Sequence, residues 1–453
     1  MNINNIDDIS RLALLNIENN SNLALEGMEG YRKALNQLKR QKLRIIATDM
    51  ITNSKALQAA FLTAINTGKR AFKGGVFITV PSNVPMLLPW SHTATLNEVA
   101  MELGGIFDIK SDSTFTLHIG ENAKDNNSLE IVANCWQGGV IACGDQIQID
   151  SNPDGVLGGV FAGSLGVALG FLRVSGEKKD STILSKGISL WRPDLDWTNP
   201  NAIGPSVSFF PKKIWMLGLG HLGQAYVWTL SLFSFNQPSE LNILLQDVDT
   251  VKKANIDTGL LSENHNLSHY KTRVCSKWLE SRGINTQICE RLFDESYVPS
   301  ENESDILICG LDSISTRRIL DTNKFKNILD CGLGGNKSNF DSVSFFNLGE
   351  LKKSANEIWE MNESGKDNPE SKKMFTQIFG CGEYDKGIGS SFMGALSASI
   401  LFSEILRAYH KGKKNSHARL WARTLEGKLT TSILIEDYEN SMSYSKAGFV
   451  IIE

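Results

Sequence analysis

A glycine-rich run lies near the middle of the chain, Gly218-Leu219-Gly220-His221-Leu222-Gly223. It follows the apolar stretch IWML, which has the pattern of a strand, and precedes AYVWTLSLF, which has the composition of a helix. Glycines at a strand-to-helix turn leave backbone N–H groups and the positive end of the helix open to a phosphate. The run therefore predicts a nucleotide site. The alternative interpretation is a tight turn without a ligand.

Two acids and a lysine follow the glycine run. Asp247 ends the next predicted strand, where it can accept hydrogen bonds from ribose hydroxyls. Lys271 opens the following predicted helix, and Asp312 ends the predicted strand DILICGLD. A lysine and a carboxylate at one edge of a sheet suit ATP with Mg²⁺, because the cation neutralises phosphate oxygens and the carboxylate holds the metal. Hydride transfer needs neither group, so the ordered set favours ATP over a nicotinamide dinucleotide.

Strand-like and helix-like segments alternate around these residues. From residue 212 onward the order of segments predicts a parallel sheet with right-handed crossovers. Residues 10–70 have apolar residues at helical spacing, and short apolar runs from residue 75 indicate strands. Residues 174–211 have no long period, so we expect an extended linker there. The fold class predicted from these patterns is α/β with a mixed or parallel sheet.

Two apolar segments resemble each other, FAGSLGVAL (Phe161 to Leu169) and FMGALSASI (Phe392 to Ile400). A duplicated nucleotide-binding fold would explain this match and the length of the chain. The alternative is two buried helices of similar composition. The first segment lies within Gly155 to Leu172, which is uncharged and near the length of a membrane span. Its six glycines disfavour a lone helix in lipid, so we expect a buried helix of a soluble domain.

The composition excludes several classes of protein. The chain has 46 Lys and Arg against 50 Asp and Glu, and the resulting net charge of −4 gives no basic excess for nucleic acid. Its seven cysteines are scattered without a CxxC pair, which is typical of a reducing cytoplasm. The N-terminal residues do not have the pattern of a signal peptide. We expect a cytoplasmic protein that binds neither nucleic acid nor membrane.

The ordered motifs resemble those of the ThiF/MoeB/ubiquitin-activating enzyme superfamily, from about residue 212 to residue 410. They are the glycine run, D-x-D-x-V-x-x-x-N from Asp247 to Asn255, Lys271 sixteen positions later, and Asp312. Members adenylate the C-terminal glycine of a ubiquitin-like protein. The chain looks closest to the activating enzymes of bacterial ubiquitin-like conjugation operons (Bil-type), including those of antiviral defence.

The resemblance implies a Rossmann-like adenylation fold in two pseudo-repeated lobes. It divides the chain into an inactive lobe with N-terminal helices (1–205), an active ATP-binding domain (206–420) and a C-terminal β tail (421–453). By position, it implies that Asp249 and Asn255 join Asp247 and Lys271 around ATP, and that Asp312 carries Mg²⁺ and acts with Lys271 in catalysis. The ATP-binding loop would consist of Gly218, Gly220, His221, Leu222 and Gly223.

One position departs from the pattern of the superfamily. The family continues N-L-x-R-Q, whereas Asn255 is followed here by Ile-Asp-Thr258-Gly259, so the arginine on the β- and γ-phosphates is missing from its place. Two-lobed members take a second arginine from the inactive lobe. The sequence leaves open which arginine substitutes: Arg11, Arg32, Arg44, Arg70 or the nearer Arg273.

Cys381 begins a segment that looks like the one before the last buried helix in these enzymes, where a cysteine receives the activated protein. We therefore expect Cys381 to form a thioester, and the alternative is a cysteine that only packs. The other six cysteines lie in or beside apolar runs and are expected in the core.

The implied partners are a ubiquitin-like protein and a conjugating enzyme, with homodimerisation left open. Adenylation of a peptide or a small carboxylate is not separated from this activity by the sequence. Two further functions also stay open. One is a non-catalytic nucleotide-binding scaffold, and the other is an NAD-dependent oxidoreductase on the same Rossmann fold.

Overall fold

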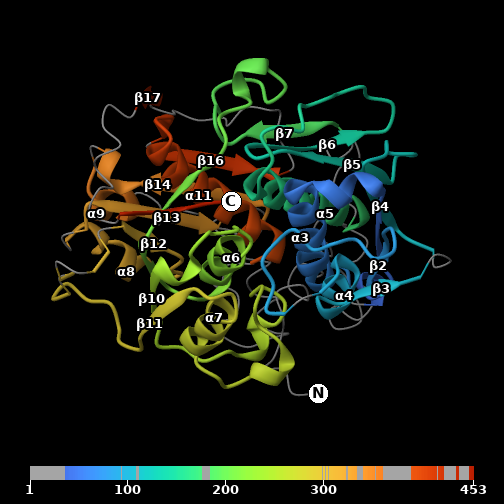
Figure 1. Cartoon of the computed structure of the whole chain (residues 1–453). Helices are drawn as coiled ribbons and strands as arrows, with labels where there is room; N and C mark the ends of the chain where they lie inside the picture. Colours follow the sequence, from blue (N-terminus) through green and yellow to red (C-terminus); the bar gives the residue numbers. More distant parts are fainter. Residues whose placement is uncertain are drawn as a thin grey trace, which may run out of the picture.

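The computed structural model describes residues 36–92, 94–108, 112–175, 184–297, 299–300, 303–304, 306–322, 325–333, 340–351, 353–360, 389–415, 417–422, 435–437 and 448–453. Of the helical region predicted over residues 10–70, the part before residue 36 lies outside the described residues, as does the predicted catalytic Cys381. Within the described part, Lys55–Ala71 is a helix, but Leu43–Ala47 forms a strand, so the prediction of helix is wrong there. Figure 1 shows two sheets with a group of helices between them.

The first sheet is formed by the N-terminal part of the chain and has seven strands in the order β3-β2-β1-β4-β5-β6-β7. The first five are parallel, and β6 and β7 run antiparallel to their neighbours. The strands are β1 (Leu43–Ala47), β2 (Val76–Thr79), β3 (Gly105–Phe107), β4 (Phe115–Ile119), β5 (Ser128–Ala133), β6 (Gln137–Ala142) and β7 (Lys186–Ser189).

The second sheet also has seven strands, in the order β11-β10-β9-β12-β13-β14-β16. Five strands are again parallel, and β14 and β16 are antiparallel. The strands are β9 (Lys213–Leu217), β10 (Asn242–Gln246), β11 (Asn285–Cys289), β12 (Ile306–Cys309), β13 (Asn327–Leu333), β14 (Ser342–Asn347) and β16 (His417–Trp421).

The two sheets have the same topology. In each sheet the first strand is inside the sheet, the second and third strands follow on one side of it, and the fourth to seventh follow on the other. The order of parallel and antiparallel pairs is also the same. These findings confirm the predicted α/β fold of two pseudo-repeated lobes with mixed sheets, which we call the N-terminal and C-terminal lobes. The domain limits near residues 205 and 420 stay a prediction.

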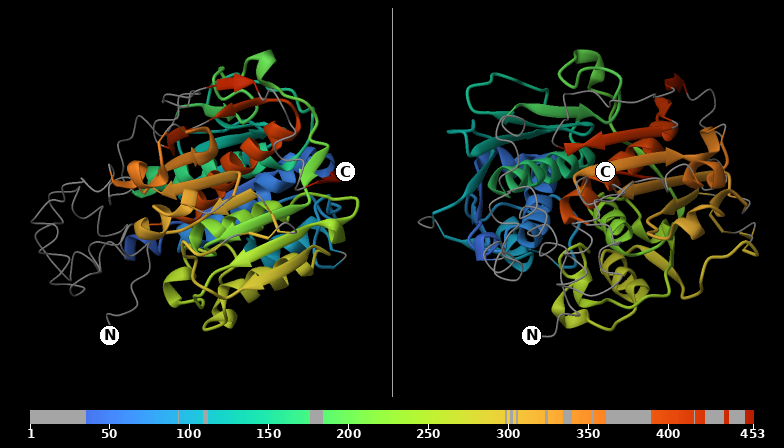
Figure 2. Two further views of the ribbon diagram at one scale, coloured as in Figure 1. Left: turned by 90° about the vertical axis from the view of Figure 1, so that its left-hand side faces the viewer. Right: turned by 180° about the vertical axis from the view of Figure 1, so that it is seen from behind.

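Four helices fill the space between the sheets, two from each lobe: α3 (Lys55–Ala71), α5 (Val156–Ser175), α6 (His221–Leu230) and α11 (Ser391–Tyr409). Helix α5 packs on β4, β5 and β6, α11 packs on β13 and β14, and the two helices contact each other. Figure 2 shows the same central position of these helices from two other sides. Because α5 and α11 occupy corresponding places in the two lobes, the resemblance between their sequences reflects the repeat.

The remaining elements are short. Helices α4 (Leu96–Glu102), α7 (Lys271–Glu280), α8 (Ile314–Arg317) and α9 (Ala355–Glu360) lie outside the central group. Strand β8 (Phe209–Pro211) pairs with β18 (Phe449–Ile451), and β15 (Lys413–Asn415) pairs with β17 (Ile435–Asp437). Short 3-10 helices in the described residues are η1 (Asp49–Asn53), η2 (Pro200–Ala202), η3 (Pro238–Glu240), η4 (Lys253–Asn255), η5 (Asn264–Asn266), η6 (Leu320–Thr322) and η8 (Leu348–Glu350).

The prediction of a linker over residues 174–211 is wrong. This segment contains β7, which forms the edge of the first sheet and pairs with β6. The sequence of β7 is KGIS, whose single large apolar residue gives no strand pattern, although Lys186 and Ile188 are both buried.

The packing of helix α5 against α3 requires glycine at two positions of α5. A Cβ at Gly159 would overlap the carbonyl oxygen of Ala56 in α3, and a Cβ at Gly163 would overlap that of Ala60. The glycines therefore allow the two helix backbones to touch. Helices α5 and α11 are long and apolar enough to cross a membrane, but 94% and 100% of their most apolar windows are buried inside the protein. The expectation of a buried core helix for Gly155 to Leu172 is confirmed.

We predict that Gly163→Ala lowers the free energy of unfolding by about 2 kcal/mol, because overpacking against a backbone atom typically costs about 1 to 3 kcal/mol. Gly166→Ala in the same helix is the matched control. Its Cβ would meet Leu117 Cδ2, the end of a side chain, at 3.0 Å, and both changes carry the same gain in helix propensity. Equal stability of the two variants in urea unfolding would contradict this account of the helix contact.

Candidate active site

The glycine run forms the turn between β9 and α6, as predicted. Gly218 has φ +81, and a Cβ there would lie 2.9 Å from the carbonyl oxygen of Gly310. A Cβ at Gly223 would overlap the carbonyl oxygen of Gly218. Gly220 differs, because a Cβ there would meet no atom within 4 Å. The chain itself thus requires two of the glycines, whereas the third borders open space at the start of a helix.

His221 and Leu222 turn their side chains away from this open space. The Nε2 atom of His221 is buried beside α11, and a Cβ at Gly394 would lie 2.7 Å from it. Burial lowers the pKa of His221 to about 4, so the imidazole is neutral. Leu222 is a core residue. Both residues are therefore able to face a ligand at this turn only through their backbone.

Asp247 supports the glycine turn. Its Oδ2 accepts a hydrogen bond from the Leu219 amide at 2.6 Å, and its Oδ1 accepts one from the Asp249 amide at 2.7 Å. A carboxylate has about four lone-pair sites, so these contacts leave capacity for a ribose hydroxyl. The predicted role of Asp247 on ribose stays a prediction, and its contact with the turn was not expected.

Lys271 begins α7 and is 7% exposed. Its Nζ lies 2.9 Å from Asp249 Oδ2 and 3.9 Å from Asp247 Oδ2. The hydrogen bond from Lys271 lowers the pKa of Asp249, so this carboxylate is ionised at neutral pH. Lys271, Asp247 and Asp249 thus lie together beside the glycine turn. The ammonium group of Lys271 has one close carboxylate partner, which is half exposed.

The ends of three neighbouring strands bring the other residues to the same edge. Strand β9 lies between β10 and β12 in the sheet, and the Gly310 amide after β12 donates to the Leu217 carbonyl at 2.8 Å. Asp312 follows on this turn and is exposed. Asn255 ends η4, is partly buried, and accepts a hydrogen bond from the Lys252 amide at 2.8 Å through its Oδ1.

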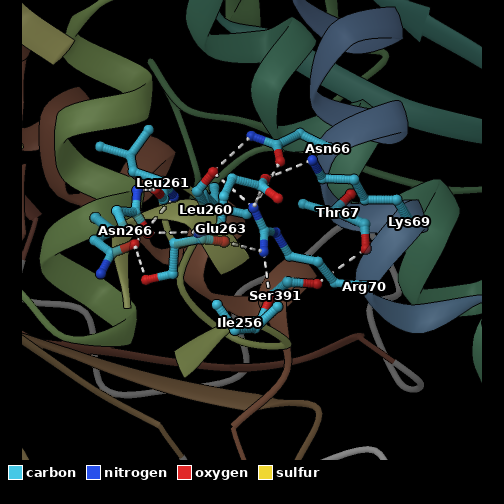
Figure 3. A network of polar contacts seen from close by, with 12 residues as sticks. Asn66, Thr67, Lys69, Arg70, Ile256, Leu260, Leu261, Glu263, Asn266 and Ser391 are labelled. Atoms are coloured by element: carbon cyan, nitrogen blue, oxygen red, sulfur yellow. Dashed lines mark hydrogen bonds and ion pairs between the residues drawn. The ribbon is translucent and has the colours of Figure 1, made fainter. Parts of the chain in front are cut away.

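Among the described arginines that could substitute for the missing one, one reaches the segment after Asn255. Arg273 is exposed and pairs with Glu290 at 3.0 Å, and Arg44 donates to the Asp108 carbonyl at 3.0 Å in its own lobe. Arg70, in α3 of the N-terminal lobe, contacts residues 256–263 of the other lobe (Figure 3). Arg11 and Arg32 lie outside the described residues.

Arg317 is a residue of this edge that the sequence reasoning missed. Its Nη2 donates to the carbonyls of Leu311 at 2.6 Å and Cys331 at 2.8 Å, which ties the turn of Asp312 to β13. Its Nε lies 3.5 Å from the buried Asp330, whose pKa burial raises to about 7. The available signal was an arginine five positions after the strand-end aspartate.

The remaining cysteines follow the prediction in part. Cys135, Cys275, Cys309 and Cys331 are buried, as expected. Cys143 is exposed and Cys289 is partly exposed, so the prediction that all six lie in the core is wrong for these two. The sequence VIACG puts Cys143 beyond the end of β6, where the apolar run no longer reports burial.

Two family profiles match the chain: the BilD N-terminal domain over residues 42–190 and the BilD C-terminal domain over residues 210–412. The bacterial E1-like protein BilD of Collimonas sp. (strain OK412) is 30% identical over 398 residues, which cover 84% of this chain and 86% of that protein. The chain belongs to the BilD family of bacterial E1-like proteins. The predicted resemblance to E1-like enzymes is therefore confirmed.

Several solved structures are similar at low sequence identity. Escherichia coli MccB has a TM-score of 0.34 and 15% identity, and the match covers 71% of this chain and 95% of that chain. E. coli MccB with ATP gives a TM-score of 0.32 and 14% identity over 71% and 97% of the two chains. E. coli tRNA N6-threonylcarbamoyladenosine dehydratase, TcdA, has a TM-score of 0.29 and 13% identity, and the match covers 43% of this chain and 85% of that chain.

We predict that Gly220→Ala keeps the wild-type melting temperature but weakens ATP binding at least tenfold, because its methyl group enters the open space beside the turn. Gly223→Ala is the comparison, since it should instead lower the melting temperature by several degrees through its overlap with Gly218. Calorimetric ATP titration and thermal unfolding of both variants provide the measurements. Unchanged ATP affinity in a folded Gly220→Ala variant would place the nucleotide elsewhere.

Proposed function

We propose that this chain adenylates the C-terminal glycine of a ubiquitin-like protein at the carboxyl edge of the second sheet. The observation that supports this most strongly is that the open glycine turn and Asp312 follow the adjacent strands β9 and β12, while Lys271 lies beside this turn at the start of α7. Membership of an E1-like family supports the same reaction class. We expect the α-phosphate to lie between the partner's carboxylate and the amides of the turn.

The charges at this edge suit Mg-ATP. Among the residues that the structure describes, no three His, Cys, Asp or Glu side chains gather as in a metal site made by protein alone. Asp312 is exposed and would supply one carboxylate to Mg²⁺, whose other ligands would be phosphate oxygens and water. The bound metal would neutralise charge on the phosphates. Lys271 would exchange its contact with the half-exposed Asp249 for a phosphate oxygen.

The first chemical step is an attack by the terminal carboxylate on the α-phosphorus of ATP. A carboxyl oxygen–phosphorus bond forms, the bond from the α-phosphorus to the bridging oxygen breaks, and pyrophosphate leaves with its electron pair. Lys271 and the amides of the glycine turn would stabilise the charge that develops on the phosphate oxygens. No side chain needs to accept a proton, because the carboxylate is already ionised.

The second proposed step uses Cys381. Its thiolate would attack the carbonyl carbon of the acyl-adenylate, forming a thioester and releasing AMP, and the acyl group would then pass to a conjugating enzyme. Among the described cysteines, Cys331 lies in β13 of the same sheet, but it is fully buried, and burial raises its pKa well above the ordinary value. This makes Cys331 a poor alternative nucleophile.

In the N-terminal lobe, the turn that follows the first strand contains no glycine. Residues Thr48 to Asn53 follow β1 at the place where the glycine run follows β9, and they contain no glycine. Met50 stands there with 61% exposure. We therefore propose one nucleotide site for each chain and an inactive N-terminal lobe. A cytoplasmic role in a bacterial conjugation pathway for antiviral defence extends this proposal.

A second candidate function is a nucleotide-binding scaffold without catalysis. The observation in its favour is Thr258, which replaces the family arginine and is 5% exposed, so it places no charge near the phosphates. ATP binding without pyrophosphate exchange in the presence of the cognate partner would support the scaffold. The pairing of Lys271 with an acid at the sheet edge gives the NAD-dependent oxidoreductase no support.

We predict that Lys271→Ala raises the dissociation constant of ATP about tenfold to a hundredfold, because a charge-assisted contact contributes about 1.5 to 3 kcal/mol. The fold should persist, since the main partner of Lys271 is a half-exposed carboxylate. Lys277→Ala, at an exposed position of the same helix, should bind ATP like the wild type. Equal affinities for the Lys271→Ala and Lys277→Ala variants would reduce Lys271 to a structural ion pair.

We predict that Asp312→Ala and Cys381→Ala separate the two steps. With the cognate glycine-terminated protein, Asp312→Ala should lose ATP–pyrophosphate exchange by at least a hundredfold. Cys381→Ala should keep this exchange but lose the reductant-sensitive adduct between the two proteins. Exchange that persists in a folded Asp312→Ala variant would remove this residue from the site, and an adduct in Cys381→Ala would assign the thioester to another cysteine.

A further inference from the structure

The C-terminal end of helix α3 forms hydrogen bonds and ion pairs with residues 256–263 of the other lobe, which we call the cross-lobe segment. Figure 3 shows the polar side chains of α3 directed at this segment. Asn66 donates to the Leu260 carbonyl at 3.2 Å, and Lys69 pairs with Glu263 at 2.6 Å. Lys73 pairs with Asp257. The N-terminal lobe therefore contacts the cross-lobe segment along most of its length.

Arg70 makes the largest number of these hydrogen bonds. Its guanidinium donates to the carbonyls of Leu260 at 2.9 Å and Ser262 at 3.0 Å, and also to the carbonyl of Ile256. It lies 3.1 Å from the carboxylate of Glu263. Burial alone would raise the pKa of Glu263, but Lys69 and Arg70 outweigh it and lower that pKa, so the carboxylate is ionised.

Arg70 is too enclosed to reach a phosphate itself. Its side chain is 2% exposed, and it donates four hydrogen bonds to the cross-lobe segment. A phosphate contact would require it to leave three carbonyls and a carboxylate. Arg70 therefore does not take over the direct role of the missing arginine.

The cross-lobe segment lies in the chain between two residues of the candidate site, Asn255 and Lys271. The segment begins directly after Asn255 and includes Thr258, and the chain continues from it to Lys271. On its other side, Gln224 of α6 accepts hydrogen bonds from the Leu261 amide and the Ser262 hydroxyl, each at 3.0 Å. The segment is thus held between Arg70 of one lobe and the helix that follows the glycine turn of the other.

We propose that Arg70 is a positioning residue, supplied by the N-terminal lobe, that fixes the cross-lobe segment so that Asn255 and Lys271 face the nucleotide of the C-terminal lobe. This inference rests on the proposed function and adds a role for the lobe that has no nucleotide site. Arginine suits the role because its planar fork bonds several carbonyls at once. Lysine at this position carries the same charge but cannot reach all three carbonyls from a single nitrogen.

The experiment compares the substitution of lysine for two buried arginines, Arg70 and Arg407. Each arginine donates hydrogen bonds to the other lobe. Arg407 in α11 donates to the Leu190 carbonyl of the N-terminal lobe and pairs with Glu404. It lies about 24 Å along α11 from Ser391, at sixteen residues of 1.5 Å each, and Ser391 is hydrogen-bonded to the Thr67 carbonyl beside Arg70. Arg407→Lys therefore disturbs the same interface far from the cross-lobe segment.

We expect Arg70→Lys to raise the dissociation constant of ATP at least tenfold and to speed amide hydrogen exchange in residues 256–263. Arg407→Lys should lower the melting temperature to a similar extent while leaving ATP affinity and the exchange of this segment unchanged. If Arg70→Lys does not fold, Asn66→Ala, which loses one bond to the Leu260 carbonyl, should show the same changes to a smaller degree.

The outcomes separate this inference from the proposed function. A wild-type chain that binds ATP, together with a folded Arg70→Lys variant of equal affinity and equal exchange, would overturn the positioning role alone. Equal loss of ATP affinity in Arg70→Lys and Arg407→Lys would also overturn it, because the effect would then come from general loosening of the interface. A wild-type chain that binds no ATP would contradict the proposed function itself.

Discussion

The close packing of four helices between two sheets is the constraint on which the rest of this structure depends. Helices α5 and α11 are apolar and buried along nearly their whole length, so neither could form the surface of a separate lobe. Burial of apolar surface contributes roughly 25 cal/mol per Å², and exposure of either helix would forfeit that contribution. The glycines of α5 make this packing close enough to bring backbones into contact.

This packing also determines which residues of the N-terminal lobe lie beside the candidate active site. Because Thr67 of α3 meets the start of α11 at Ser391, the last turn of α3 comes next to the cross-lobe segment. The two lobes have the same topology but differ in the residues that follow their first strands. The C-terminal lobe has the glycine turn and the strand-end acids. The N-terminal lobe, without this turn, supplies the buried Arg70 and the second half of the core.

The sequence was most informative where a local requirement fixes the residue type. The positive φ of Gly218 and the contact of Gly223 with Gly218 both require glycine, so the turn between β9 and α6 could be predicted. Asp247 and Asp312 could be assigned to one edge of the sheet because each follows a parallel strand, and Lys271 because it begins the helix that follows. Their roles toward ATP stay a prediction. The repeat was visible because α5 and α11 have the same need for small residues.

The sequence was least informative where contacts join distant residues. Arg70 and the cross-lobe segment are separated by about 190 positions, and no spacing along the chain signals that they meet. Strand β7 was missed because its sequence, KGIS, has one large apolar residue and begins with a lysine. Its place in the sheet depends on its pairing with β6, which its own sequence does not show. The ring of His221 could not be oriented from its position in the glycine run, since its neighbour Gly394 comes from α11.

The most direct test of the account is a crystal structure of the wild-type chain with Mg²⁺ and a non-hydrolysable ATP analogue. We expect one nucleotide for each chain, with phosphates beside Gly220 and Lys271 and the metal at Asp312. Arg70 should keep its contacts with the cross-lobe segment. A nucleotide bound after β1 in the N-terminal lobe, or a dinucleotide-like pose that leaves Lys271 and Asp312 without contacts, would contradict it.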